Sequence, residues 1–340
     1  MTQRSPTFYV WIGSLVVVLI AGGWLGLKAH DARDLVKFRN AMVVKIGRAD
    51  VFDWQPATRP ADFREEHAEA PPEIRDAVNS AVGSESRNSE FLTALDLARH
   101  LAKNRQRAAP PIKKSTIETY REIVGQGQGY CADFTQVFNG LAHAAGLEVR
   151  EWGMSFEGYG GNGHAFSEVF DRGRNQWVFI DSFYSFYVTD HTGRPLAASE
   201  LRDRLLTRST DLHVEPIVAE KFGFKSPERA LDYYRRGAPS FYMWWGNDVF
   251  SYDNNAVLAH LGASRALQQL AGIMLGIQPA MMLAAGHIQA QGLLELRLIR
   301  GLLVSLTVGV TVFAITSLLL FAARRRRAAK AEKRSESGDS

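Results

Sequence analysis

The sequence predicts an α+β core that is flanked by two membrane-spanning helices. A glycine-rich loop at residues 125–129 leads into a helical pattern at residues 131–145, and two β-type runs follow at residues 164–170 and 176–181. Uncharged runs lie near both ends of the chain. The helical spacing and the paired β-type runs predict a helix packed on an antiparallel sheet, and the uncharged runs predict the membrane helices.

The helical pattern begins at Cys131, which is the only cysteine among the 340 residues. From Phe134 to Ala145 the apolar residues recur at the spacing of a buried helix face, and Gly146 ends the pattern. Cys131 is therefore expected in the first turn of the helix, where free backbone N–H groups and the helix dipole favour a thiolate. A lone cysteine is more often a small buried apolar residue. The glycine-rich loop favours a nucleophile instead, because it lets a substrate approach the sulfur closely.

His164 and Asp181 lie at the outer ends of the predicted hairpin, on either side of a turn at residues 171–175. In a hairpin the numbers of paired residues add up to a constant, so a turn centred near Gly173 puts His164 opposite Asp181 to within one residue. Opposed residues have Cβ atoms about 4.5–5.5 Å apart, which lets an imidazole and a carboxylate hydrogen-bond. This bond would fix the tautomer and leave the other ring nitrogen free to act as a base.

Three blocks of this sequence resemble the bacterial transglutaminase-like superfamily. They are GYCADF at residues 129–134, GHAFSEVF at residues 163–170 and WVFIDS at residues 177–182. The resemblance covers about residues 115–190, and it implies a papain-like fold with a Cys–His–Asp triad. Members of this superfamily include amide cross-linkers, peptidases, amidases and inactive binding modules.

The resemblance assigns a role to each residue of the triad. Cys131 would be the nucleophile, His164 the general base and then the acid, and Asp181 the group that orients His164. The backbone N–H of Cys131 and one side-chain donor are expected to stabilise the oxyanion. The sequence leaves three candidates for that donor, which are Gln126, Gln128 and Tyr130.

No cofactor and no metal are expected. The sequence contains no phosphate-binding or dinucleotide-binding motif. A zinc site usually contains close ligand pairs such as CxxC, which a single cysteine excludes. The net charge of +4 owes much to residues 324–334, so a nucleic-acid partner is not expected. One cysteine forms no intrachain disulfide, and the compartment cannot be inferred from cysteine pairing.

Two uncharged runs are long enough to cross a bilayer. Residues 8–27 form a run of 20 residues, which is longer than the apolar region of about 7–15 residues in a signal peptide, so an uncleaved anchor is favoured over a cleaved signal. Residues 302–323 form the second run, and four arginines follow it at 324–327. Such a basic cluster indicates the cytoplasmic side. We therefore expect a two-span protein of a bacterial inner (cytoplasmic) membrane, with both termini in the cytoplasm and the catalytic domain extracytoplasmic.

The predicted domain organisation has seven segments. They are a cytoplasmic N-terminus (1–7), a transmembrane helix (8–27), a helical and irregular extracytoplasmic region (28–114), the transglutaminase-like core (115–195), a helical and aromatic-rich extension (196–300), a second transmembrane helix (302–323) and a basic cytoplasmic tail (324–340). Outside the Cys131 helix, further helices are expected at residues 31–46, 91–104, 115–124, 199–206 and 226–235.

Three segments carry further expectations. Residues 182–187 are rich in aromatic side chains and are expected to continue the sheet. The aromatic run at 241–252 is compatible with a core segment, an interfacial belt or a wall on which a substrate stacks. Residues 256–299 are expected to be mostly helical. Within them, an amphipathic or interfacial helix at 270–286 is favoured over a third crossing because Gln278 and Pro279 lie at its centre.

The predicted function is thiol acyl chemistry on an amide bond. Cys131 attacks, His164 removes its proton and an acyl-enzyme forms. Water as the acceptor gives a hydrolase, either a peptidase or an amidase, whereas an amine gives a cross-linking acyltransferase. The other function class is a non-catalytic module that serves cell-envelope or polysaccharide assembly. The expected partners are the membrane and a protein or peptide amide substrate, and the sequence leaves the oligomeric state open.

Overall fold

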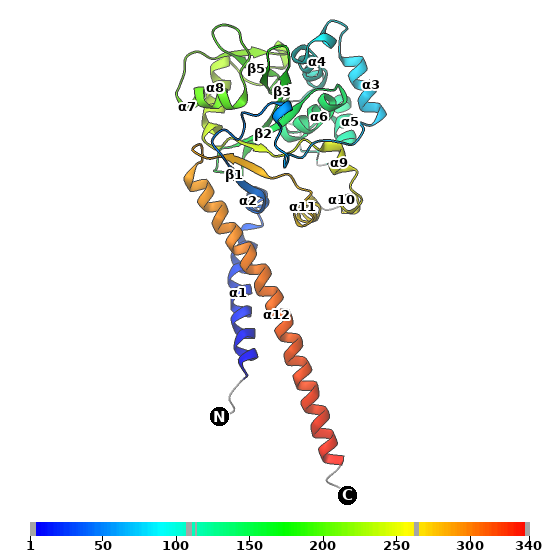
Figure 1. Cartoon of the computed structure of the whole chain (residues 1–340), viewed down its shortest axis with the longest axis vertical. Helices are drawn as coiled ribbons and strands as arrows, with labels where there is room; N and C mark the ends of the chain where they lie inside the picture. The colour runs from blue at the N-terminus through cyan, green and yellow to red at the C-terminus, as the bar shows by residue number, and fades with distance from the viewer. Residues whose placement is uncertain (1–4, 107–110, 113, 262–264, 337–340) are drawn as a thin grey trace. The chain divides into compact units, whose positions relative to one another are not determined.

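The computed structural model describes residues 5–106, 111–112, 114–261 and 265–336 (Figure 1). The chain divides into two compact units, one within residues 1–41 and 294–340 and the other at residues 42–293. The helices are α1 (Pro6–Lys28), α2 (Ala32–Val43), α3 (Pro72–Ala81), α4 (Glu90–Ala102), α5 (Thr116–Gln126), α6 (Cys131–Ala144), α7 (Ala198–Leu206), α8 (Pro227–Gly237), α9 (Val249–Asp253), α10 (Ala256–His260), α11 (Arg265–Met274) and α12 (Ala290–Glu336). The strands are β1 (Val44–Gly47), β2 (Val149–Ser155), β3 (Gly163–Asp171), β4 (Gln176–Ile180), β5 (Phe186–Thr189), β6 (His213–Pro216), β7 (Tyr242–Trp244) and β8 (Met281–Ala284). The predicted α+β class is confirmed.

A six-stranded sheet forms the centre of the unit at residues 42–293, in the order β1-β8-β7-β2-β3-β4. Its neighbouring strands are antiparallel except β1 and β8, which are parallel. Strands β5 and β6 form a separate antiparallel pair. The prediction that residues 182–187 continue the main sheet is therefore wrong. Asp181 and Phe186 pair with each other in an isolated bridge, so the chain turns away after β4.

Helices cover both faces of this sheet (Figure 1). On one face α4 and α6 pack against β3, and the apolar core there includes Val169 and Ile180. On the other face α7 and α8 contribute to a second core, which includes Trp152, Phe166 and Phe179. Because both faces are buried, β4 carries apolar side chains at successive positions, and the polar residues Ser167 and Glu168 of β3 are buried as well.

Local sequence signals account for several helix boundaries. The helices expected at residues 91–104, 115–124, 199–206 and 226–235 are confirmed as α4, α5, α7 and α8, to within about two residues at most ends. For example, α8 begins after Ser226, whose side chain accepts the backbone N–H of Arg229, and it has proline in its first turn.

Long-range pairing overrides two helical predictions. The helix expected at residues 31–46 ends at Val43, and the chain continues as β1, which pairs with β8 more than 200 residues away. Residues 256–299 form α10, α11, β8 and the beginning of α12 rather than one helical region. All four residues of β8 are buried between β1 and β7, so residues 270–286 form neither a third crossing nor one interfacial helix.

The aromatic run at residues 241–252 contributes mainly to the core. Phe241, Met243, Trp245 and Phe250 are all buried. Trp245 packs against Phe63 with their ring centroids 5.5 Å apart. Of the three alternatives, this burial supports a core segment.

A buried ion pair joins β2 and β3. The Nε of Arg150 lies 2.7 Å from an oxygen of Glu168, and both side chains are fully buried. Glu168 also accepts hydrogen bonds from the Trp152 indole and the backbone N–H of Ala198. The Arg150 guanidinium lies 4.0 Å from the ring centroid of Trp177. These contacts satisfy both charges inside the sheet, which is the condition for tolerating an ion pair there.

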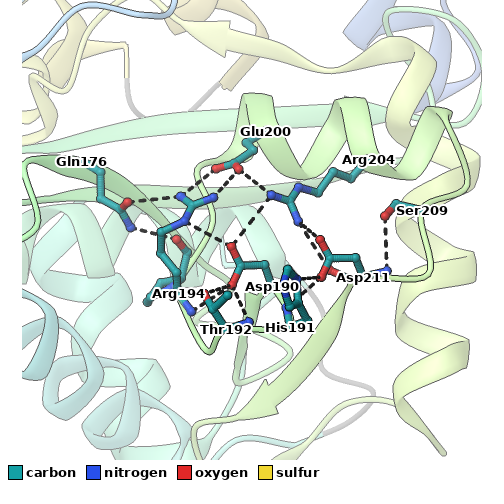
Figure 2. Close-up of polar contacts among 10 residues, drawn as sticks. Gln176, Asp190, His191, Thr192, Arg194, Glu200, Arg204, Ser209 and Asp211 are labelled. Carbon is teal, nitrogen blue, oxygen red and sulfur yellow. Dashed lines mark hydrogen bonds and ion pairs between the residues drawn. The ribbon is translucent and has the colours of Figure 1, made fainter.

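A second polar network surrounds the loop between β5 and α7 (Figure 2). Figure 2 shows Arg194 between Gln176 and Glu200, while Arg204 reaches from Glu200 to Asp211. Hydrogen bonding by the Thr192 hydroxyl and by the backbone N–H groups of Thr192 and Arg194 lowers the pKa of Asp190 (also in Figure 2). The network connects this loop to α7 and to the segment before β6.

The unit within residues 1–41 and 294–340 contains two antiparallel helices, α1 and α12, which run side by side (Figure 1). Trp11 of α1 stacks on Phe313 of α12 with ring centroids 5.3 Å apart, and its indole donates a 2.8 Å hydrogen bond to Ser317. Lys37 and Glu295 form an ion pair of 2.8 Å. Within the described residues, the segments long and apolar enough to cross a membrane are Pro6–Lys28 and Ala290–Ala329. They contain the two uncharged runs.

Candidate active site

Cys131 is the first residue of α6, as the loop-to-helix pattern predicts. Its side chain is half-buried. Asp133, two residues later, accepts hydrogen bonds from the backbone N–H groups of Tyr130 (2.8 Å) and Ile112 (3.1 Å). This carboxylate therefore holds the loop before Cys131 and a neighbouring segment against the start of α6. Asp133 is not among the site residues predicted from the sequence, although its position in the first helical turn is typical of a capping residue.

Gly127 fixes the path of the glycine-rich loop. Its φ is +68°, and a Cβ atom there would lie 1.7 Å from the carbonyl oxygen of Asn104. The loop is held at this point because the Asn104 amide donates to the carbonyl of Val124, and the backbone N–H of Gln106 donates to the carbonyl of Gly127. Only glycine fits both the backbone conformation and the space.

His164 and Asp181 are in direct polar contact. The Nε2 of His164 lies 2.8 Å from Oδ2 of Asp181, and both side chains are buried. The two residues do not face each other directly across strands β3 and β4. The pairing of Ser167 with Ile180 centres the turn between Gly173 and Arg174, so that Asp181 would face Phe166. His164 lies two residues from that position on the same face, within diagonal reach of the carboxylate. The predicted register is therefore wrong.

Asp181 accepts three hydrogen bonds, and each comes from a different part of the chain. Oδ2 accepts from Nε2 of His164 and from the hydroxyl of Tyr234, the latter at 2.7 Å. Oδ1 accepts from the backbone N–H of Tyr184 at 2.8 Å. Burial, with the negative charge of Asp181 nearby, raises the pKa of Tyr234 well above its usual value, so its hydroxyl stays a neutral donor.

The turn after Asp181 is held in an unusual conformation. Ser185 has a φ of +61°, a region that residues other than glycine rarely adopt. The guanidinium of Arg105 donates hydrogen bonds to the carbonyl groups of Phe183 and Lys221, across the turn. These contacts fix the backbone that supplies the Tyr184 N–H to Asp181.

Aromatic rings cover the imidazole of His164. Tyr184 stacks on it with ring centroids 4.7 Å apart and an interplanar angle of 25°, and Tyr233 contacts it edge-on at 5.8 Å. The hydroxyl groups of Tyr184 and Tyr233 lie 3.5 Å apart. Only 4% of His164 is exposed, so the rings shield its bond to Asp181 from water.

The charges around His164 favour its protonated form. Burial alone lowers the pKa of His164, but the negative charges of Asp181 and of the Cys131 sulfur, together with hydrogen bonds to both, raise it from 6.5 to about 10. Because Nε2 is bonded to Asp181, the nitrogen that remains for the sulfur is Nδ1. An imidazolium beside a sulfur stabilises the thiolate. The arrangement is therefore that of a nucleophile, a base and an orienting carboxylate.

The three predicted oxyanion donors lie at the end of α5 (Gln126) and in the loop before α6 (Gln128 and Tyr130). The amide of Gln128 donates to the side-chain oxygen of Gln126 at 3.0 Å, and Tyr130 is 52% exposed. The choice among them stays a prediction. The backbone N–H of Cys131 lies in the first turn of α6, where helical N–H groups have no partner within the helix.

The described residues contain no group of three or more His, Cys, Asp or Glu side chains arranged to hold a metal ion.

Besides Asp133, three aromatic residues of the site were not predicted from the sequence. Tyr184, Tyr233 and Tyr234 follow the hairpin in sequence and reach the site through the turn after β4 and through α8. One weak signal existed for Tyr234, since Ala230, Tyr234 and Gly237 recur at helical spacing and form the buried face of α8. That pattern predicts a core position and gives no indication of a contact with Asp181.

Residues 76–182 match the family model of the transglutaminase-like superfamily. No curated protein and no solved structure matches the chain. The matched segment begins at residue 76, whereas the resemblance was expected to begin at about residue 115. It contains Cys131, His164 and Asp181. The chain therefore carries, at residues 76–182, a domain of the transglutaminase-like superfamily, as its three sequence blocks predict.

Proposed function

We propose that this protein is a membrane-anchored thiol enzyme that acts on amide bonds through a Cys131 acyl-enzyme. The observation that carries the proposal is the arrangement at the start of α6, where Cys131 interacts with an imidazole whose far nitrogen is 2.8 Å from Asp181. A sulfur at a helix N-terminus beside a protonated His164 has the two features that activate cysteine nucleophiles.

The proposed reaction has two stages. The Cys131 thiolate attacks the carbonyl carbon of the amide, and the tetrahedral oxyanion is stabilised by the backbone N–H of Cys131. The C–N bond then breaks, the amine leaves with the proton of the His164 imidazolium, and a thioester remains on the sulfur. In the second stage, water or an amine loses a proton to His164 and attacks the thioester. The products are a free acid or a new amide, and the thiolate and imidazolium are regenerated.

We also propose that the unit at residues 42–293 lies outside the cytoplasm, anchored in a bacterial inner membrane by α1 and α12. Support comes from the antiparallel packing of these helices, which puts the beginning of α1 and the end of α12 on one side, and from the arginines at 324–327. A protein or peptide amide in that compartment is the proposed substrate. The alternative is a non-catalytic role in cell-envelope or polysaccharide assembly, and the next experiment distinguishes it from catalysis.

Iodoacetamide should label Cys131 of the full-length protein in detergent micelles at pH 6. His164 stays protonated well above this pH because its pKa is raised to about 10, so it stabilises the thiolate there. An ordinary thiol has a pKa of about 8.5 and is almost entirely un-ionised at pH 6. Because Cys131 is the only cysteine, mass spectrometry of the intact protein measures its labelling rate without background.

Two comparisons make the labelling result decisive. The variant His164→Ala should require a higher pH for the same rate, while its thermal unfolding temperature shows that it is folded. A second variant, His164→Gln, keeps more of the side-chain volume, so that loss of the imidazole can be told apart from collapse of the surrounding side chains into an empty space. If the parent is labelled at pH 6 no faster than glutathione, the catalytic proposal fails and the binding-module alternative is favoured.

The proposed topology predicts which side of the membrane each segment occupies. In spheroplasts, a membrane-impermeant maleimide should label Cys131 in the parent protein. In a Cys131→Ser background, cysteines introduced as Ser5→Cys or Ser335→Cys should react only after the membrane is opened, because both chain ends are then cytoplasmic. Immediate labelling of either terminal cysteine would contradict the two-span orientation.

A further inference from the structure

Tyr234 contacts the same carboxylate oxygen as His164. Its hydroxyl donates to Oδ2 of Asp181 at 2.7 Å, and the whole residue is only 1% exposed. Tyr234 lies on α8, more than 50 residues beyond the end of the matched superfamily domain. Helix α8 therefore brings a polar group to the centre of the site from outside that domain.

Apart from Asp181, the imidazole of His164 and the ring of Tyr233, the surroundings of Tyr234 are apolar. Its ring packs against Phe166, Phe179, Phe186 and Phe241, with ring centroids 5.4–6.4 Å apart. A tyrosine hydroxyl carried into such a cluster loses its hydration, and that cost is recovered only if it finds a buried partner. Packing alone would be satisfied by phenylalanine, so the hydroxyl points to a specific role at Asp181.

A buried carboxylate stays ionised only when enough donors replace water. Asp181 has three such donors, from His164, Tyr184 and Tyr234. The Tyr184 donor is a backbone N–H, and His164 is the group that Asp181 is proposed to orient. The Tyr234 hydroxyl is therefore the one side-chain donor of the three that takes no part in the proposed proton transfers.

We propose that Tyr234 is a positioning residue that keeps the Asp181 carboxylate aimed at Nε2 of His164, and thereby maintains the imidazolium–thiolate pair. The inference rests on the proposed function, because it assigns Tyr234 a role in that same site. Without the hydroxyl, the backbone N–H of Tyr184 is the one donor other than the imidazole that still holds the carboxylate, so Oδ2 is free to turn away from Nε2 and the ion pair with His164 lengthens. The imidazolium then loses its proton more readily, and less of Cys131 is present as thiolate.

Several ionisable groups face the pair. Cys131 faces the imidazole from α6, Tyr184 from the turn after β4, and Tyr233 from α8, while Arg105 supports the turn from the segment after α4. The hydroxyl of Tyr233 contacts that of Tyr184 rather than the carboxylate.

The test compares Tyr234→Phe with the parent protein, using the pH dependence of iodoacetamide labelling at Cys131. A hydrogen bond to a charged group is worth enough to change an equilibrium by roughly tenfold or more. We therefore expect the pH of half-maximal labelling to rise by about one unit, and the rate at pH 6 to fall by roughly tenfold. The ring is retained in the variant, so its thermal unfolding temperature should stay close to that of the parent.

A control variant distinguishes positioning from general disturbance. Tyr159→Phe removes a buried hydroxyl that accepts the backbone N–H of Gln289 and should keep the parental pH profile. A Tyr234→Phe profile that superimposes on the parental one would overturn the inference while the proposed function stands. Slow labelling of the parent itself at pH 6 would instead remove the proposed function, on which the inference rests.

Discussion

Replacing Asp181 by asparagine should slow acylation of Cys131 on the order of 10–10³-fold and leave the fold intact. The same change in a serine protease costs about 10⁴ in kcat. We expect a smaller loss because a thiolate depends less on its base than a hydroxyl does. The expected loss is nevertheless large, because Asp181 is the acceptor in all three of its hydrogen bonds in this site.

The donors around Asp181 determine how an asparagine would sit. The backbone N–H of Tyr184 cannot change direction or become an acceptor, so the amide oxygen must occupy the position of Oδ1. The amide NH₂ then faces Nε2 of His164 and the hydroxyl of Tyr234. The imidazole must accept at Nε2 and carry its proton on Nδ1, where it faces the sulfur. That tautomer cannot take a proton from the thiol.

Acylation is measured as the burst of p-nitrophenolate that p-nitrophenyl acetate releases when it acetylates Cys131. The matched control is Asp232→Asn, which removes an exposed carboxylate paired with Arg235 on α8 and should keep the parental rate. Thermal unfolding temperatures equal to that of the parent in both variants exclude a folding defect. A parental rate in Asp181→Ala would eliminate Asp181 from the mechanism.

Replacing Arg150 by methionine should lower the free energy of unfolding by about 3–5 kcal/mol, because it leaves the Glu168 carboxylate buried without a partner of opposite charge. The two remaining donors to Glu168, the Trp152 indole and the backbone N–H of Ala198, are neutral. A lone buried carboxylate is costly when it is charged and much less so when it is protonated. The loss should therefore be larger at pH 8 than at pH 5.

The free energy is obtained from a urea titration in detergent, followed by tryptophan fluorescence, because Trp152 and Trp177 lie beside the ion pair. The control is Arg121→Met, which breaks an exposed pair with Glu73 and should leave the midpoint almost unchanged. Equal midpoints for Arg150→Met and the parent at pH 8 would show that the buried pair contributes little to stability.

The sequence alone predicted those parts of the site that depend on neighbouring residues. The spacing from Phe134 to Ala145 correctly predicted the helix that begins at Cys131, because helical periodicity is visible within a few turns. The two β-type runs predicted the antiparallel hairpin that brings His164 and Asp181 together. The uncharged runs predicted two long apolar helices. In each case the determining pattern lies within about 20 contiguous residues.

The tertiary structure decided the contacts that join distant segments. The pairing of β1 with β8 converts residues 281–284 from an expected helix into a central strand, because burial between two strands outweighs local helical preference. The alignment of His164 with Asp181 depends on where the turn is centred. An error of one residue in that centre changes which residues face each other across the two strands. No local pattern marks Tyr234 as a partner of Asp181, since its helical spacing predicts only burial. Periodicity identifies which side chains turn inward, whereas packing of α8 against the sheet determines which carboxylate Tyr234 meets.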